Sequence, residues 1–291
     1  MISAIDLTGA AIAGVLTGLV YGLSALGLSV IFGVIRIVNF AHGEFMVIGM
    51  FVALVLFRLF GLDPMLAILP TAALLFVVGY YLQKWVVSRV SHLPDHMQFL
   101  LLAGVAIMIV SGCLLVFGPD AQGVQVSYGL DSYAIGALVI DKTRVFAAIA
   151  AVIFASVLLA FFKYSATGRA IRACADNNLG AKVVGLDIDR LYALTFGIGT
   201  ACVGAAGCII LLIVEVHPYL APGYTLLAFV IVIVGGMGSL FGALVGGILI
   251  GVYEQLASLV MQPSLKSAFS FALLILVLLI RPQGLLGKET K

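Results

Sequence analysis

The sequence predicts an all-α fold: a polytopic membrane helical bundle of about eight or nine transmembrane segments, some of them short or broken at glycines. Hydrophobic residues make up 63% of the 291-residue chain and charged residues only 10%, whereas soluble domains use about 45–50% and about 25%. The charges are also segregated, since no Asp, Glu, Lys or Arg lies between Glu215 and Glu254. Apolar stretches of about 20 residues cross the hydrocarbon core as helices, so several spans are expected.

Apolar segments follow one another along the whole chain, which indicates a single membrane domain over residues 1–291. The first Lys or Arg is Arg36, so the first segment lacks the basic start of a cleaved signal peptide and is expected to be a retained span. The last segment is short. The segments are 9–35, 44–60, 64–82, 97–117, 143–162, 191–214, 225–239, 240–261 and 267–280.

Glycines are abundant within these segments. Gly14, Gly18 and Gly22 recur every fourth residue, which places small residues on one helix face where another backbone can approach. The long uncharged run holds two helices only if Gly235, Gly236 and Gly238 interrupt it, and glycines at such a position mark broken or closely packed helices.

The distribution of Lys and Arg gives the expected orientation. In a nine-span arrangement with its N-terminus outside, 11 of the 15 basic residues fall on one side: Arg36, Lys84, Arg89, Lys163, Arg169, Arg172, Lys182, Arg190, Arg281, Lys288 and Lys291. The other side keeps Arg58, Lys142, Arg144 and Lys266. By the positive-inside rule, residues 163–190 and the C-terminal tail are cytoplasmic and 118–142 is the main periplasmic loop.

The longest cytoplasmic stretch, 163–190, is expected to contain a short helix between two spans. Thr167 is its predicted N-cap and Gly180 its predicted C-terminal stop. Arg169, Arg172 and Asp176 recur at intervals of three and four, so they share a face, and Arg172 and Asp176 are able to pair. A solvated loop helix explains these features, but so long a loop with structure of its own favours a docking helix for a cytoplasmic partner.

A polar segment, Asn39-Phe-Ala-His-Gly-Glu44, lies between the first and second spans. Two interpretations remain open. Asn39 is a candidate N-cap and Glu44 suits a helix N-terminus, so the segment is a cap and turn. Alternatively Asn39, His42 and Glu44 line the inner end of a translocation path.

Glu215, His217 and Glu254 flank the uncharged run and are further candidates for the pathway, because ionisable residues within a membrane are functional candidates. The chain has no phosphate-binding loop of the form G-x-x-x-x-G-K-[ST], so any coupling to ATP needs another subunit. Its four cysteines show no C-x-x-C spacing and there is no H-E-x-x-H, so no metal site is predicted. No nucleophile with a base is visible either, which argues against an intramembrane enzyme. An ion-coupled secondary transporter or a channel remains the alternative class.

Four blocks of the sequence resemble those of a known protein family. They are 22–33 with the Asn-Phe-Ala-His-Gly-Glu-Phe run of 39–45, 168–177 with Gly185, 235–243 through Glu254, and the Arg-Pro-Gln-Gly-Leu-Leu-Gly run of 281–287. In this order, and over nearly the whole chain, they resemble the permeases of branched-chain amino acid ABC importers of the LivH type.

The resemblance implies a multi-pass protein of the bacterial cytoplasmic (inner) membrane that pairs with a second related permease of the LivM type. It also implies two cytoplasmic ABC ATPases, which bind ATP and Mg, and an extracytoplasmic substrate-binding protein. The chain itself is expected to hold no cofactor, to have no catalytic activity and to bind no nucleic acid. The block around 168–177 is implied to be the coupling helix, contributing Thr167, Gly168, Arg169, Arg172, Asp176 and Asn177. Related systems carry urea, short amides or aromatic acids, so the solute stays open.

Overall fold

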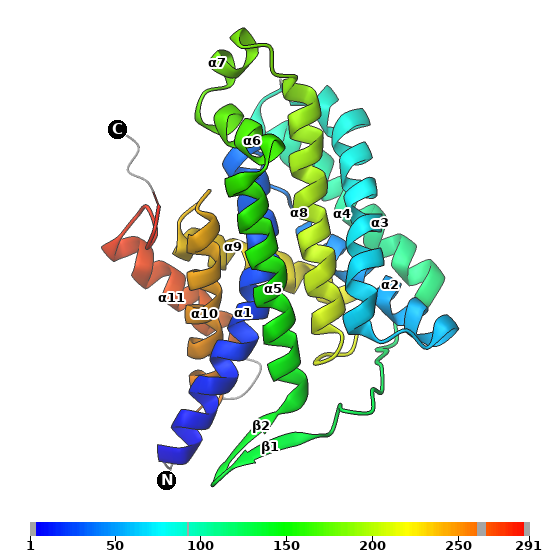
Figure 1. The fold of residues 1–291 in the computed structure, drawn as a ribbon, viewed down its shortest axis with the longest axis vertical. Coiled ribbons are helices and arrows are strands. Elements are labelled where there is room, and N and C mark those ends of the chain that lie inside the picture. Colours follow the sequence, from blue (N-terminus) through cyan, green and yellow to red (C-terminus); the bar gives the residue numbers. More distant parts are fainter. Residues whose placement is uncertain (1–3, 92, 261–265, 288–291) are drawn as a thin grey trace.

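The computed structural model of the protein is a bundle of helices with one small β-hairpin (Figure 1). It describes residues 4–91, 93–260 and 266–287. Within these residues eight helices are long and apolar enough to cross a membrane, and a shorter apolar helix covers Phe269–Ile280. The prediction of an all-α bundle with eight or nine segments is therefore confirmed. Lys288 and Lys291, which entered the count of basic residues, lie outside the described residues.

The helix boundaries agree with the predicted segments to within a few residues. The long helices are α1 (Ala4–Ile35), α2 (His42–Phe60), α3 (Pro64–Trp85), α4 (Asp95–Phe117), α5 (Lys142–Tyr164), α8 (Ile188–Ile210), α9 (Ala221–Gly235), α10 (Leu240–Ala257) and α11 (Lys266–Ile280). The short ones are α6 (Ala166–Asp176), α7 (Asn178–Val183) and the 3₁₀ turns η1 (Val87–Arg89) and η2 (Pro218–Leu220). The N-terminus of α1 lies at the end of the bundle opposite α6 and α7 (Figure 1).

Backbone contact between glycines joins α1 to α10. A Cβ added at Gly14 would lie 2.8 Å from the carbonyl oxygen of Gly251, and one added at Gly18 would lie 2.6 Å from that of Gly247. Any side chain at these positions would force the helices apart, so the predicted small-residue face is a packing surface between two helices. In a bilayer such close approach is a main source of helix association, because lipid offers no hydrophobic driving force between helices.

Helix α8 is the most deeply buried span and packs on α1, α2 and α3. Gly27 of α1 and Gly199 of α8 meet backbone to backbone. On the opposite side the Oγ1 of Thr200 donates to the carbonyl oxygen of Leu75 in α3 at 2.8 Å, next to Gly79, where no side chain would fit. The core of the bundle therefore lies around α1 and α8.

The break within the uncharged run lies where the three glycines predicted it. Helix α9 ends at Gly235, and Gly236 and Gly238 follow with φ of 106° and 80°, a region that favours glycine. Ser239 then caps α10 by accepting the N–H of Gly242 at 3.0 Å. The C-terminal segment secures this corner, because the N–H of Leu285 donates to the carbonyl of Val234 at 2.9 Å.

The loop between α4 and α5 contains a β-hairpin that was not predicted from the sequence. Strands β1 (Ser132–Ile135) and β2 (Leu138–Asp141) pair antiparallel, with Ser132 opposite Asp141. Gly136 supplies the positive φ, 63°, that a two-residue turn needs at its first position. At the base of the hairpin, Lys142 Nζ lies 2.8 Å from Asp131 Oδ2.

Tyr128 fastens the same loop to the start of α3. Its hydroxyl lies 2.9 and 2.8 Å from the two carboxylate oxygens of Asp63, and Asp63 also caps α3 by accepting the N–H of Met65 at 2.8 Å. Burial and the neighbouring carboxylate raise the pKa of Tyr128 well above its ordinary value, so the hydroxyl stays a proton donor. The loop is therefore an ordered cover on its end of the bundle.

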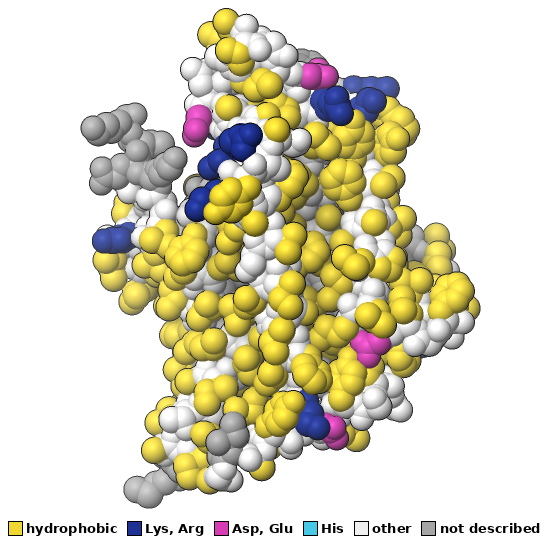
Figure 2. Space-filling model, viewed as in Figure 1, with side chains coloured by type: hydrophobic (Ala, Val, Ile, Leu, Met, Phe, Trp, Pro, Cys, Tyr) yellow, Lys and Arg dark blue, Asp and Glu magenta, His cyan; other side chains and the backbone are white. Residues whose placement is uncertain are grey.

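Figure 2 shows how side chains are distributed over one face of the molecule. Hydrophobic side chains cover the middle of this face as a broad band, and most of the visible Lys and Arg side chains gather toward the end that carries α6 and α7. A band of this kind is what a lipid-exposed surface requires.

Candidate functional site

The polar segment before α2 turns back into the bundle. Arg36 adopts a φ of 60° directly after α1 ends at Ile35, and α2 begins at His42. The Nε2 of His42 lies 3.1 Å from the carbonyl oxygen of Ser24 in α1. Ser24 precedes Ile35 by eleven residues, or about 16 Å of helix. Helix α2 therefore starts well inside the bundle rather than at its surface.

The first turn of α2 and the second turn of α9 meet at this depth. The N–H of Gly43 donates to Thr225 Oγ1 at 2.8 Å, and this hydroxyl lies 3.2 Å from Glu44 Oε2. A side chain on Gly43 has no room, because its Cβ would lie 2.7 Å from the backbone nitrogen of Thr225. Of the predicted residues, the structure thus brings His42 against Ser24 of α1 and Glu44 against Thr225 of α9, and neither partner was predicted from the sequence.

Asn39 is buried in the turn before α2, but it does not have the predicted role of N-cap. Its Oδ1 accepts the N–H of Ala41 at 3.1 Å, within the turn, and Ala41 occupies the N-cap position. The Nδ2 of Asn39 and the Nδ1 of His42 are buried and have no hydrogen-bond partner among the described residues. Glu44 does lie in the first turn of α2, as expected, where a carboxylate is favoured by the helix dipole.

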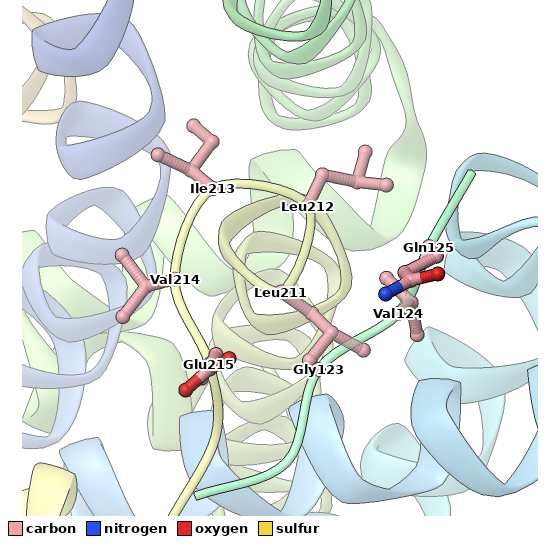
Figure 3. A pocket seen from close by; sticks show the side chains of 8 residues that line it. All are labelled: Gly123, Val124, Gln125, Leu211, Leu212, Ile213, Val214 and Glu215. Carbon is pink, nitrogen blue, oxygen red and sulfur yellow. The ribbon is translucent and has the colours of Figure 1, made fainter. Parts of the chain in front are cut away.

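Glu215 and His217 lie elsewhere, in the loop that follows α8. This loop pairs with the loop after α4 through two backbone hydrogen bonds between Gln122 and Val216, of 2.9 and 2.7 Å. The side chain of Gln122 accepts from Arg58 at 2.7 Å. A pocket of about 240 Å³ opens beside the pair, with Glu215 on its wall (Figure 3). Because Glu215 is exposed, it belongs to the mouth of the bundle and not to its interior.

Glu254 occupies a third place. It is 7% exposed and lies in α10, where Ser270 of α11 donates to its Oε1 at 2.7 Å. Tyr21 of α1 lies near its carboxyl group. A cavity of about 400 Å³ opens beside these groups. The six predicted pathway residues therefore fall into a buried cluster, an exposed mouth and a cavity wall.

The predicted coupling segment forms a sharp corner between α5 and α6. Ser165 ends α5, its N–H donating to Phe161, and it caps α6, its Oγ accepting the N–H of Gly168 at 2.8 Å. Thr167 is therefore not the N-cap; it is exposed within the first turn. A Cβ on Gly168 would lie 2.7 Å from the Cα of Phe162, so only glycine allows α6 to fold back this closely.

One face of α6 is fixed and the other is free. Ile171 and Cys174 are buried, whereas Arg169, Arg172 and Asp176 are exposed on a common face, as predicted. Arg169 donates to the carbonyl of Tyr164 at 2.7 Å and so closes the end of α5. The predicted pairing of Arg172 with Asp176 is not formed, since the ion pairs among the described residues join Lys142 to Asp131 and Arg144 to Asp141.

The end of α6 also differs from the expectation. The helix ends at Asp176, and the side chain of Asn177 accepts the N–H of Gly180 at 2.8 Å to cap α7. Gly180 thus lies inside α7 instead of ending the preceding helix. Both starts follow the ordinary N-cap pattern, in which a side-chain oxygen accepts the backbone N–H three residues later, from Gly168 to Ser165 and from Gly180 to Asn177.

Together these features define a multi-pass membrane protein with polar groups inside its bundle and a rigid helical corner outside its spans, the class of membrane transport proteins. The chain belongs to the family described as the permease component of the branched-chain amino acid transport system, which its residues 10–278 match. No solved structure matches it.

Named relatives extend over nearly the full chain. It is 33% identical over 289 residues to the high-affinity branched-chain amino acid transport system permease protein LivH of Salmonella typhimurium, and equally to that of Escherichia coli, in each case over 94% of both chains. It is 29% identical to the corresponding protein BraD of Pseudomonas aeruginosa, again over 94% of both. This chain is therefore a transport permease and a translocation subunit.

Proposed function

We propose that this chain is one permease subunit of an ATP-driven importer of the bacterial cytoplasmic membrane, and that it carries branched-chain amino acids. The observation that carries the proposal is α6, a capped amphipathic helix outside the spans, fixed by Gly168 and Ile171 and presenting Arg172 and Asp176 outward. A helix so attached can pass a partner's movement to α5 as a rigid element. The solute is inferred from the relatives, which are permeases of branched-chain amino acid transport systems.

Besides this chain, the proposed assembly has four subunits: two ATPases, a second permease and a binding protein. Two cytoplasmic ATPases bind ATP and Mg, because the sequence of this chain contains no phosphate-binding loop. They dock on the exposed face of α6. A second, related permease completes the pathway and an extracytoplasmic binding protein delivers the solute to the hairpin end. Basic side chains gathered at the α6 end support a cytoplasmic location for it.

Within the proposed pathway, the cluster of Asn39, His42, Glu44 and Thr225 is a closed constriction. Its polar groups are buried and lie at or near the starts of two helices, α2 and α9, that meet inside the bundle. Discontinuous helices of this kind form solute sites in many transporters. Separation of α9 from α2 would break the bond between Gly43 and Thr225 and expose these groups to a passing solute.

The test is copurification followed by transport. The chain is expressed with the neighbouring transport genes of its own source and purified through a tag on this chain; the expected result is an ATPase in a fixed ratio to it. The assembly is then placed in vesicles with the binding protein and labelled L-leucine. Uptake should require ATP. Uptake driven instead by a sodium or proton gradient without ATP would establish the alternative class, an ion-coupled transporter.

The solute is tested in the same vesicles by competition. Unlabelled isoleucine and valine should suppress leucine uptake, whereas urea, acetamide and benzoate should not. If urea, acetamide or benzoate suppressed leucine uptake and isoleucine and valine did not, the chain would be assigned to the urea, amide or aromatic-acid systems. The ATP-driven mechanism would still hold.

A further inference from the structure

The pocket beside Glu215 lies where two paired segments of the chain separate (Figure 3). Gln122 and Val216 exchange both of their backbone hydrogen bonds. In an antiparallel ladder, the next pair with main-chain groups facing each other would be Val124 and Val214. These two do not bond, because the N–H of Val214 donates to the carbonyl of Ile210 at 2.9 Å instead. The two segments therefore diverge, and the space between them is the pocket.

This mouth pocket, lined by residues 123–125 and 211–215, has a volume of about 240 Å³. That volume is smaller than the roughly 300–1,000 Å³ of sites for drug-sized ligands, so the pocket suits a single small solute. It lies just beyond the end of α8, the most deeply buried span, and so at one end of the core. The strand side is held in place, because Arg58 of α2 donates to the side chain of Gln122 at 2.7 Å.

The two walls of the mouth pocket offer different polar groups. On the strand side, the N–H and C=O groups of residues 123–125 form no hydrogen bond with any described residue. On the other side α8 ends at Ile210, and the carbonyls of Leu211 and Leu212 beyond it are likewise unbonded within the described chain. The C-terminal end of a helix carries a partial negative charge. Glu215 adds a full negative charge to this wall, and the ion pairs among the described residues do not involve it.

An apolar surface lies between these walls. Figure 3 shows the side chain of Leu211 pointing into the space between the turn and the strand, and Leu211 is only 2% exposed. An ammonium group needs acceptors and a carboxylate needs N–H donors. The mouth pocket offers both kinds of group together with an aliphatic contact. This combination matches a zwitterionic α-amino acid with an aliphatic side chain.

We propose that the mouth pocket is a receiving site for the amino acid released by the binding protein. Glu215 accepts its ammonium group, and the free N–H groups of residues 123–125 bind its carboxylate. The aliphatic side chain of the solute lies against Leu211. This inference deepens the proposed function and rests on it. A molecule without one or both charged groups, such as benzoate or urea, leaves at least one wall unsatisfied.

The test measures occupancy of the mouth pocket by protection of a cysteine. The complete importer carrying Gln125→Cys is placed in right-side-out vesicles without ATP or binding protein and treated with a membrane-impermeant maleimide. Gln125 lines the pocket and is exposed, and the four native cysteines are buried. L-leucine should slow the reaction at a lower concentration than isoamylamine or 4-methylpentanoate, each of which carries only one of its charged groups. Ser127→Cys, exposed on the same loop outside the pocket, is the control and should react at the same rate with and without solute.

Glu215 is tested in the same reporter background. Glu215→Gln should raise the concentration of L-leucine that gives half-protection by about fivefold, as expected for the loss of one contact between opposite charges in watery surroundings. Protection by isoamylamine should weaken likewise, and protection by 4-methylpentanoate should not weaken, because it has no ammonium group. A general change in the structure of the loop would weaken all three alike. Glu215→Asp should retain most of the protection by L-leucine.

The outcomes separate the receiving site from the proposed function. Unchanged labelling of Gln125→Cys in the presence of L-leucine overturns the receiving site, even where ATP-driven uptake is normal. Undiminished protection by L-leucine in Glu215→Gln, together with slower uptake from the binding protein, overturns it as well and assigns Glu215 to contact with that protein. Failure of ATP-driven uptake in wild-type vesicles counts against the proposed function instead, while the labelling still reports on the mouth pocket.

Discussion

The backbone N–H of Gly43 donates to the hydroxyl of Thr225 at 2.8 Å, across 182 positions of sequence. The bond joins the first turn of α2 to the second turn of α9, inside the bundle. The same hydroxyl lies 3.2 Å from Glu44, so one threonine side chain serves two groups of the other helix. A change at either residue should therefore disturb the buried cluster as a whole.

Gly43→Ala should destabilise the protein by about 1–3 kcal/mol, because the new methyl group would press on the backbone of α9. Thr225→Val should cost a similar amount, since it leaves the Gly43 N–H buried without a partner. Thermal unfolding of the detergent-solubilised protein measures both. Gly104→Ala in α4 is the matched control, because nothing lies within 4 Å of the added Cβ; equal melting temperatures for the three variants would contradict the assigned contact.

Gly168→Ala should uncouple ATP hydrolysis from transport. The added methyl group would meet the backbone of Phe161 and Phe162 and open the corner between α5 and α6. Solute-stimulated ATP hydrolysis in vesicles should fall by about tenfold or more, whereas membrane insertion should be unchanged. The control is Ala173→Gly on the exposed face of α6. An active Gly168→Ala importer would show that the corner need not be rigid.

Replacing both Arg169 and Arg172 by Glu should weaken docking of the ATPase. The two single variants should differ in their effect on thermal stability. Arg172 has no hydrogen bond or ion pair among the described residues and is exposed, so Arg172→Glu should impair copurification of the ATPase without lowering the melting temperature. Arg169→Glu should impair copurification and also lower the melting temperature, because it removes the hydrogen bond to the Tyr164 carbonyl. Lys182→Glu, an exposed charge reversal in α7, is the control. Normal docking of the double variant would mean that these arginines form only a solvated face.

Cysteine accessibility should place the loop of 118–142 outside and α7 inside. The four native cysteines are buried, so they give a low background with a membrane-impermeant maleimide. Gln125→Cys should react in intact cells and Lys182→Cys only after permeabilisation, since both positions are exposed. The opposite pattern would invert the proposed orientation.

His42→Ala should lower the transport rate by about tenfold, equivalent to about 1.4 kcal/mol, because it removes a buried hydrogen bond to α1. The order of preference among leucine, isoleucine and valine should stay the same, since the binding protein is expected to set it. Uptake with competing solutes measures both quantities. His96→Ala, in an exposed first turn of α4, should have no effect, and a changed preference in His42→Ala would place selectivity in this chain.

The spans were predictable because each depends on local composition alone. The break at Gly235, Gly236 and Gly238 was predictable for the same reason, since the positive φ of Gly236 and Gly238 is one that glycine adopts most readily. The helix start at Ser165 was placed two residues too late, at Thr167, because both residues are good caps and only the contact of Gly168 with α5 decides between them.

The candidate site was predictable only in part. His42 and Glu44 were identified from their residue types, but their partners Ser24 and Thr225 lie on other spans, and no local pattern reports such a contact. The depth of His42 was equally hidden, because it depends on the turn at Arg36 that leads the chain back into the bundle. The bond of Tyr128 to Asp63 also joins residues far apart in sequence.

The glycine contact between α1 and α10 has a consequence for biosynthesis. Gly18 leaves the ribosome long before its partner Gly247; at about 5–20 residues per second the interval is roughly 10 to 45 s. During that interval the first span resides in the membrane with its glycine face open to lipid or to the insertion machinery. Helix α1 therefore reaches its final packing only late in translation. A chain truncated before residue 240 would lack α10, the main packing partner of α1.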